Sequence, residues 1–139
     1  MLDNTKHVLF LRLGAVAGLL AVVLGAFGAH QLKKVVSAQE VAVYETGIRY
    51  QFYHAFALLA VGVLLYLKPS SLLVKSGYAF AIGIVLFSGS IYGLALRNVC
   101  EVNMNWLGPI TPVGGLFLIL GWFLLLLSLK NYNLQNSNS

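Results

Sequence analysis

The chain has very little charge for its length. Asp, Glu, Lys and Arg together make up 9% of its 139 residues, whereas about 25% is usual in soluble globular proteins, because charge keeps their surface wetted. Hydrophobic residues make up 59%, which is more apolar surface than one small core can bury from water. The composition therefore excludes an ordinary water-soluble domain and indicates a chain that dissolves in the lipid bilayer.

Acidic residues and cysteine are scarce as well, and this scarcity excludes several kinds of site. The single cysteine, Cys100, cannot form an intramolecular disulfide. No Ser-His-Asp order, pair of carboxylates or nucleotide-binding glycine loop stands out. His30, Glu45 and His54 could be considered as metal ligands, but they lack the local spacing of a metal motif. We therefore expect no enzymatic activity, no cofactor and no metal.

The basic residues give a net charge of +5 but do not form a cluster. Nucleic-acid binding would require basic residues gathered on one exposed face. Here they are spread over the whole chain and mostly flank apolar runs, which is typical of anchors to lipid headgroups. We expect their partner to be the lipid bilayer and not a nucleic acid.

Four long apolar runs dominate the sequence, at about residues 8–29, 47–67, 73–96 and 106–129. A helix rises about 1.5 Å per residue, so roughly 20 residues cross a hydrocarbon core of about 30 Å. All four runs reach that length, and none alternates apolar with polar residues as a barrel strand would. The sequence predicts an all-α membrane protein, a four-transmembrane-helix bundle. We expect a single membrane domain over residues 1–139, with a polar tail at 131–139.

The connections between the runs carry turn and capping signals. Pro69 lies in a tight break between the second and third runs, which predicts antiparallel neighbours. Ser37 and Glu40 fit a capping box, so we expect a short interfacial helix between helices 1 and 2, or an extension of the second helix. Thr111 followed by Pro112 fits the N-cap and first residue of the fourth helix. The alternative there is irregular backbone, as at some transport sites.

Two further features concern how the chain sits in the membrane. The first run is longer than the apolar part of a signal peptide and carries packing glycines, so we expect it to be retained, with cleavage near Gly28 as the alternative. Basic residues are almost equally divided between the two sides, so the positive-inside rule favours cytoplasmic termini only slightly. We expect a multi-pass protein of the plasma membrane, as in a bacterial inner membrane.

Small residues recur at helical spacing within the runs. In lipid there is little hydrophobic force between helices, so close van der Waals contact across small residues contributes more. We expect tight packing within the chain, with a homo-oligomer interface as the alternative. The candidate packing residues are Gly14, Gly18, Gly25, Gly89, Gly93, Gly114 and Gly115.

A polar cluster opens the second run. Glu45 and Arg49 are four residues apart and share a helical face with Tyr53, whereas Tyr50 and His54 share a neighbouring face. One interpretation is an interfacial salt bridge, with Arg49 snorkelling to the headgroups and the tyrosines in an aromatic belt. The other is a polar pocket that handles an anion or relays a proton. The candidate pocket residues are Glu45, Arg49, Tyr50, Tyr53, His54 and His30.

The polar cluster belongs to a set of motifs spread along the chain. They are GAFGAH at 25–30, ETGIRYQFYHA at 45–55, LFSGSIY at 86–92, LGPITPVGG at 107–115 and GW at 121–122. In this order they resemble the signature of the domain-of-unknown-function 423 family, small membrane proteins of bacteria with an animal relative, transmembrane protein 256. The resemblance implies a multi-span protein in a bacterial plasma membrane. It implies no catalytic residue, because no activity is established for the family.

Two functions therefore stand as expectations. The first is a non-enzymatic structural or accessory membrane component, with a second copy of the chain or another membrane protein as a possible partner. It follows from the glycine pattern and from the lack of a catalytic constellation. The second is a small transporter or channel whose polar pocket is formed by Glu45, Arg49 and His54.

Overall fold

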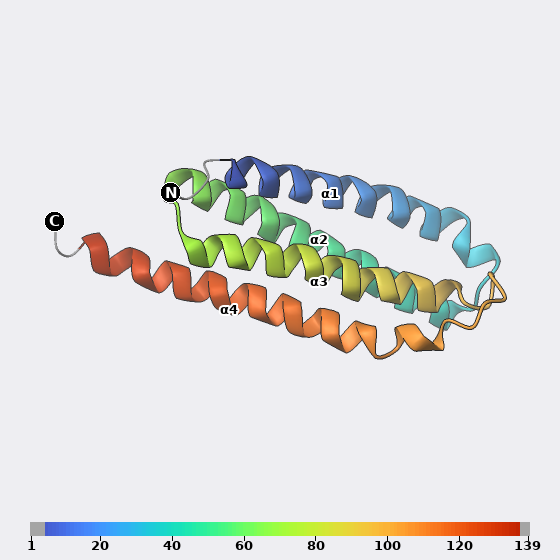
Figure 1. Ribbon diagram of the computed structural model, residues 1–139. Helices are drawn as coiled ribbons and strands as arrows, with labels where there is room; N and C mark the ends of the chain where they lie inside the picture. The colour runs from blue at the N-terminus through green and yellow to red at the C-terminus, as the bar shows by residue number, and fades with distance from the viewer. Residues whose placement is uncertain (1–4, 137–139) are drawn as a thin grey trace.

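The computed structural model describes residues 5–136, with side chains described for residues 5–130. Its four long helices lie side by side along a common direction (Figure 1). The elements in chain order are α1 (Lys6–His30), the 3-10 turn η1 (Leu32–Lys34), α2 (Ala38–Leu67), α3 (Ser71–Leu96), the 3-10 turn η2 (Asn105–Leu107) and α4 (Ile110–Asn136). Residues 5–136 contain no strand, which confirms the all-α prediction. The tail expected at 131–139 continues α4 as far as Asn136, and its last three residues lie outside the described residues.

Each of the long helices is long and apolar enough to cross a membrane. They contain 25, 30, 26 and 27 residues. At about 1.5 Å per residue, all are longer than a hydrocarbon core of about 30 Å. The end turns therefore reach the headgroup regions, and the chain is a four-span membrane protein.

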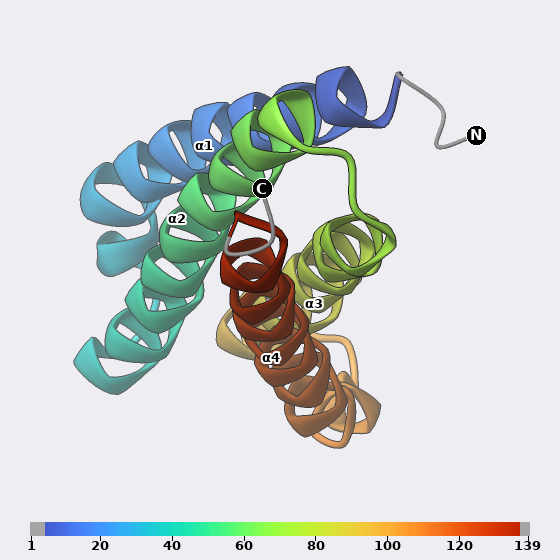
Figure 2. The same ribbon diagram turned by 90° about the vertical axis from the view of Figure 1, so that its left-hand side faces the viewer.

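Neighbours in sequence are also neighbours in space. α1 packs on α2, α2 on α3 and α3 on α4, so that α1 and α4 lie on either side of the central pair in Figure 1. Figure 2 shows the bundle from the end at which α4 finishes, with α4 beside α3. The start of α1, the end of α4 and the short connection at residues 68–70 share one end of the bundle (Figure 1). The opposite end carries the longer connections, residues 31–37 and 97–109, and is called the loop end below.

Burial separates the central helices from the outer ones. In the most apolar window of each helix, 44% of α2 and 39% of α3 is buried, against 17% of α1 and 22% of α4. The outer helices expose large apolar side chains such as Leu19 and Val23 on α1 and Leu116 and Ile119 on α4. Such a surface is unfavourable in water, but lipid tails are as apolar as these side chains. The exposed faces of α1 and α4 are therefore part of the lipid-facing surface.

Close helix contacts occur at some of the predicted packing glycines and not at others. A Cβ atom at Gly14 would lie 2.9 Å from the backbone oxygen of Ala55. At Gly114 a Cβ would collide with the backbone of α3 at Phe87, and at Gly93 with a side chain of η2. Gly25 and Gly115 have ordinary van der Waals room. Gly18 and Gly89 meet no other atom within 4 Å of a built Cβ, so these two positions do not pack within the described chain.

The start of α2 confirms the predicted capping box. The Ser37 hydroxyl accepts from the Glu40 backbone N–H at 3.2 Å, and the Glu40 carboxylate accepts from the Ser37 backbone N–H at 2.9 Å. The helix then continues without a break to Leu67. Of the two forms expected for this region, the structure therefore has the extension of the second helix, and the turn η1 occupies the connection before it.

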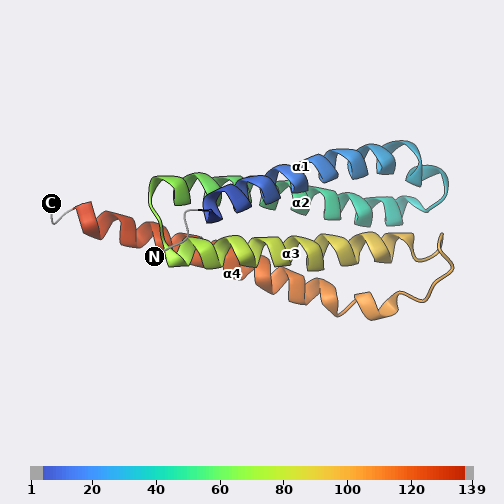
Figure 3. The same cartoon turned by 45° about the horizontal axis from the view of Figure 1, so that its top comes forward.

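The start of α4 differs from the prediction that Thr111 is its N-cap. The helix begins at Ile110, directly after the turn η2 and two further residues (Figure 3). Thr111 is thus already inside the first turn. Its hydroxyl is hydrogen-bonded to the Ser90 hydroxyl of α3 at 2.7 Å, so it fixes α4 against α3 and does not cap the helix.

Candidate functional site

The polar cluster predicted on α2 is divided between two faces of the helix. Successive residues turn by about 100°, so Glu45 and His54, nine residues apart, point in opposite directions. Glu45 and Arg49 form an exposed outer face beside α1. Gly47, Gln51 and His54 form a buried inner face toward the other helices. The structure therefore does not bring Glu45, Arg49 and His54 into one pocket.

His54 is buried near the middle of the bundle, with 5% of its surface exposed. Its Nε2 lies 3.1 Å from the indole Nε1 of Trp122, and its Nδ1 lies 2.6 Å from the backbone oxygen of Tyr50. An indole N–H can only donate and a carbonyl oxygen can only accept. His54 is therefore a neutral imidazole with its proton on Nδ1. Both ring nitrogens are occupied, which leaves neither free to bind a metal or to exchange a proton with solvent.

Gln51 is the residue of this region that sequence reasoning missed. Its Nε2 donates to the backbone oxygen of Ala17 on α1 at 2.8 Å, and its Oε1 accepts from the Tyr92 hydroxyl of α3 at 2.7 Å. It is 5% exposed. One side chain thus connects three helices. The available signal was a glutamine within an apolar membrane run, since polar groups in lipid need internal partners.

Serine hydroxyls extend this hydrogen bonding between helices. Ser88 of α3 donates to the backbone oxygen of Gly47 at 2.8 Å, and Ser76 of α3 donates to that of Gly121 at 2.8 Å. Among the described side chains, no buried nitrogen or oxygen lacks a hydrogen-bond partner. The polar groups of the bundle interior therefore all have partners, and most of them bond to a neighbouring helix.

The outer face lies beside a small pocket between α1 and α2 at the loop end. The pocket has a volume of about 190 Å³ and includes Glu45 and Arg49 in its lining. Arg49 donates to the hydroxyl of Thr46 at 3.2 Å. Residues 5–136 contain no ion pair between Arg49 and Glu45, so the salt bridge expected as one interpretation is not formed within them.

The remaining candidates of the cluster lie apart from this pocket. Tyr50 is 40% exposed and packs against the Phe87 ring of α3 at 4.6 Å between ring centroids. Tyr53 is 58% exposed, and His30 is exposed at the end of α1. Within the described residues, no group of three or more His, Cys, Asp or Glu could hold a metal ion.

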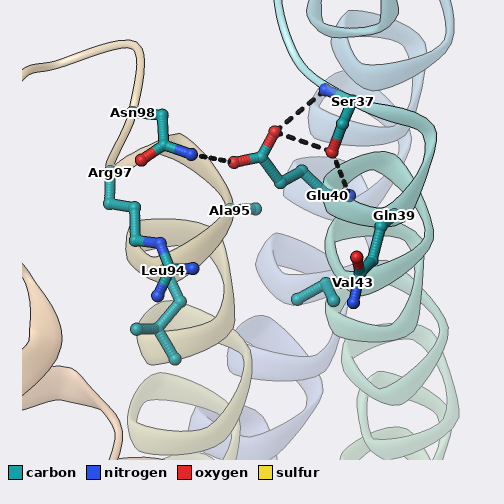
Figure 4. A pocket seen from close by; sticks show the side chains of 8 residues that line it. All are labelled: Ser37, Gln39, Glu40, Val43, Leu94, Ala95, Arg97 and Asn98. Atoms are coloured by element: carbon teal, nitrogen blue, oxygen red, sulfur yellow. Dashed lines mark hydrogen bonds between the residues drawn. The ribbon is translucent and has the colours of Figure 1, made fainter.

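A larger polar pocket, of about 500 Å³, lies at the loop end between the start of α2 and the end of α3 (Figure 4). Glu40 reaches across it, and its carboxylate accepts from the side-chain amide of Asn98 as well as from Ser37. Arg97 extends along the α3 side of the pocket toward Leu94. Glu40 of the capping box therefore also joins α2 to α3. The polar groups of this pocket thus have a structural role.

Comparison with known proteins agrees with a membrane protein and identifies its family. A family model described as "Protein of unknown function (DUF423)" matches residues 24–115. A UPF0382 membrane protein of Staphylococcus haemolyticus is 40% identical over 121 residues, which cover 86% of this chain and 93% of that protein. A UPF0382 membrane protein of Bacillus subtilis is 39% identical over 124 residues, 88% of this chain and 97% of the relative.

A UPF0382 inner membrane protein of Escherichia coli K12 is 41% identical over 112 residues, with 81% of this chain and 82% of the relative covered. No solved structure matches the chain. The printed names place these relatives in membranes and give no enzymatic activity. The chain has four helices able to span a bilayer, and with a match over most of its length it belongs to the DUF423 family of membrane proteins.

Proposed function

We propose that the protein is a non-enzymatic structural or accessory component of the membrane, and that it does not conduct a solute. The observation that supports this most strongly is the state of the buried polar groups. Gln51, His54 and Ser88 all have hydrogen-bond partners inside the bundle, and no described buried polar side-chain atom lacks one. A transport path needs polar groups that can release these partners and accept a solute or water.

An apolar groove along the membrane-spanning part supports the same proposal. It lies between α1 and α3, has a volume of about 340 Å³, and is lined mostly by apolar side chains such as Leu13, Val16 and Ile84. Only Gln51 and Tyr92 in its lining carry side-chain polar groups, and these two bond to each other. Such a groove suits lipid or another apolar helix, and not a polar solute.

A small transporter or channel is the second candidate, and the pocket at Glu45 and Arg49 is the observation that favours it. Its weakness is that His54 lies on the opposite face of α2, bonded to Trp122. A transporter built on this cluster would have to rotate or unwind α2 between two states. The two candidates therefore differ in whether Glu45 and Arg49 affect solute movement.

Reconstitution of the full chain into lipid vesicles tests the proposal. We expect no flux of protons or solutes above that of empty vesicles, over a broad solute panel and a pH series. Purification in mild detergent should recover a defined oligomer or a stoichiometric protein partner. The opposite result is a monomer without a partner and a flux that Arg49→Gln abolishes but Arg12→Gln leaves intact. This result would contradict the proposal and show that the protein is a transporter. Arg12 is a suitable control because it is an exposed arginine on α1, outside the pocket.

A further inference from the structure

The pocket between α1 and α2 at the loop end is small and carries both signs of charge. Glu45 and Arg49 of α2 line it together with the small residues Gly25, Gly28 and Ala29 of α1. Its volume of about 190 Å³ is below the roughly 300 Å³ at which pockets for whole small molecules begin. The pocket therefore has room for a charged group that belongs to a larger molecule lying mostly outside it.

The two charged side chains in this pocket do not form an ion pair with each other. Their i,i+4 spacing would allow an ion pair, yet the Arg49 guanidinium donates to the Thr46 hydroxyl at 3.2 Å. Glu45 has no hydrogen-bond or ion-pair partner in the part of the chain that the structure describes. Charges at the edge of a membrane segment are costly unless they meet an opposite charge or a headgroup. The pocket thus offers a free carboxylate and a largely free guanidinium to a ligand.

The depth of the two side chains suggests which ligand fits. α2 ends at Leu67 with Lys68 as its C-cap. Counting roughly 20 residues back from Lys68 places the other boundary of the hydrocarbon core near residue 48. Glu45 then lies on the headgroup side of this boundary, and Arg49 lies about 6 Å deeper along the helix. In a phospholipid with an amine headgroup, the phosphate is likewise deeper than the amine.

We propose that this pocket binds the headgroup of a phospholipid that carries both a phosphate and a primary amine, which is the chemistry of phosphatidylethanolamine. Arg49 donates to the phosphate oxygens, which the forked guanidinium suits well. Glu45 accepts from the ammonium group, which lies closer to water. The acyl chains lie against the exposed apolar surface below the pocket, where Phe56 of α2 is 63% exposed and Gly18 of α1 leaves open space.

This ligand is distinguished from other headgroups by its hydrogen-bond donors and its charge. A quaternary ammonium has no N–H to donate to Glu45. An anionic headgroup without an amine would bring its phosphate to Arg49 but would leave Glu45 unpaired beside a negative charge. The order of retention is therefore expected to be phosphatidylethanolamine, then phosphatidylcholine, then phosphatidylglycerol.

Native mass spectrometry of the full chain, released from micelles that contain the three lipids in equal amounts, tests the proposal. We expect phosphatidylethanolamine to be retained about tenfold more than phosphatidylglycerol, which corresponds to one charge-assisted hydrogen bond. Glu45→Gln should remove this preference, and Arg49→Gln should lower the retention of all three. Arg12→Gln and Arg97→Gln, at exposed arginines outside the pocket, should change neither.

Three results would overturn the proposal. Equal retention of the three lipids by the unsubstituted chain would overturn the proposal, whatever the variants show. If soluble glycerophosphoethanolamine saturates the pocket at the same concentration as the lipid, the ligand is a free solute and not a lipid. The third result is a dimer that forms without added lipid. If Glu45→Arg and Arg49→Glu each abolish this dimer and the double variant restores it, the two charges bind a second copy of the chain.

Discussion

The two faces of α2 carry similar numbers of polar groups but use them differently. On the inner face, Gln51 and His54 are buried and have partners on α1, α3 and α4. On the outer face, Glu45 and Arg49 are exposed beside a pocket and do not pair with each other. The same helix therefore holds the bundle together through one face and leaves charges open to a ligand through the other.

This difference shows how polar residues in a membrane segment can be interpreted. A polar group in lipid is costly unless it finds a partner, so a buried group with every atom bonded already has a structural explanation. His54 is such a case, although the sequence makes it a candidate for the polar pocket. Glu45 and Arg49 have no such explanation within the described residues, and they are the better candidates for binding.

The largest expected effect comes from adding a methyl group on the inner face. A Cβ at Gly47 would lie 2.7 Å from the ring of Tyr92 and 3.0 Å from the Ile91 side chain. That ring cannot move freely because its hydroxyl is bonded to Gln51. We expect Gly47→Ala to lower the free energy of unfolding, measured by titration with SDS in mixed micelles, by about 2–3 kcal/mol. Gly25→Ala, where the nearest atom lies 3.6 Å from a Cβ, is the matched control and should change little.

A smaller loss is expected when Gln51 is replaced by leucine. The substitution removes two hydrogen bonds between helices and leaves the Tyr92 hydroxyl without its acceptor. We expect the free energy of unfolding to fall by about 1–2 kcal/mol. Tyr92→Phe should recover part of this loss in the double variant, because it removes the stranded hydroxyl. Strictly additive effects in this cycle would show that Gln51 and Tyr92 do not act as a pair.

Removing the hydrogen-bond donor to His54 should lower the free energy of unfolding by a still smaller amount. Trp122→Phe keeps an aromatic ring near Phe80 but removes the N–H that donates to His54 Nε2. We expect a loss of about 0.6 kcal/mol, the average for a hydrogen bond between membrane helices. Nitrogen-15 NMR should show the His54 proton on Nδ1 and a shift of Nε2 in the variant. A proton on Nε2 in the unsubstituted protein would contradict the hydrogen-bond assignment.

The outer face should give the smallest change in stability. Glu45→Gln and Arg49→Gln remove exposed charges that do not pair with each other. We expect each to change the free energy of unfolding by less than about 0.5 kcal/mol. A loss as large as that of Gln51→Leu would show that the outer face contributes to stability as much as the inner face does.

The sequence was sufficient for the four spans and for the start of α2. Run length and low charge determine the number of spans, and the capping box is a local pattern of Ser37 and Glu40 that the structure repeats. The division of the polar cluster could also have been foreseen, because nine residues at about 100° each place Glu45 opposite His54.

The partners of the polar residues could not be predicted in the same way. Trp122 lies 68 residues from His54, and Ser90 lies 21 residues from Thr111. These contacts depend on how α4 is rotated and shifted against α2 and α3, which no local pattern encodes. For that reason Thr111 was expected to cap α4, although its hydroxyl is bonded to α3.

The inner face of α2 is closed to water, whereas the outer face is open. Thiol labelling in native vesicles tests it, with Glu45→Cys compared with Ser88→Cys in a chain whose exposed Cys100 is replaced by serine. A membrane-impermeant maleimide is applied from both sides of the membrane. We predict rapid labelling at position 45 and none at position 88, where the native hydroxyl is buried against Gly47. Labelling of both positions at similar rates would mean that water reaches the inner face, and would contradict the claim.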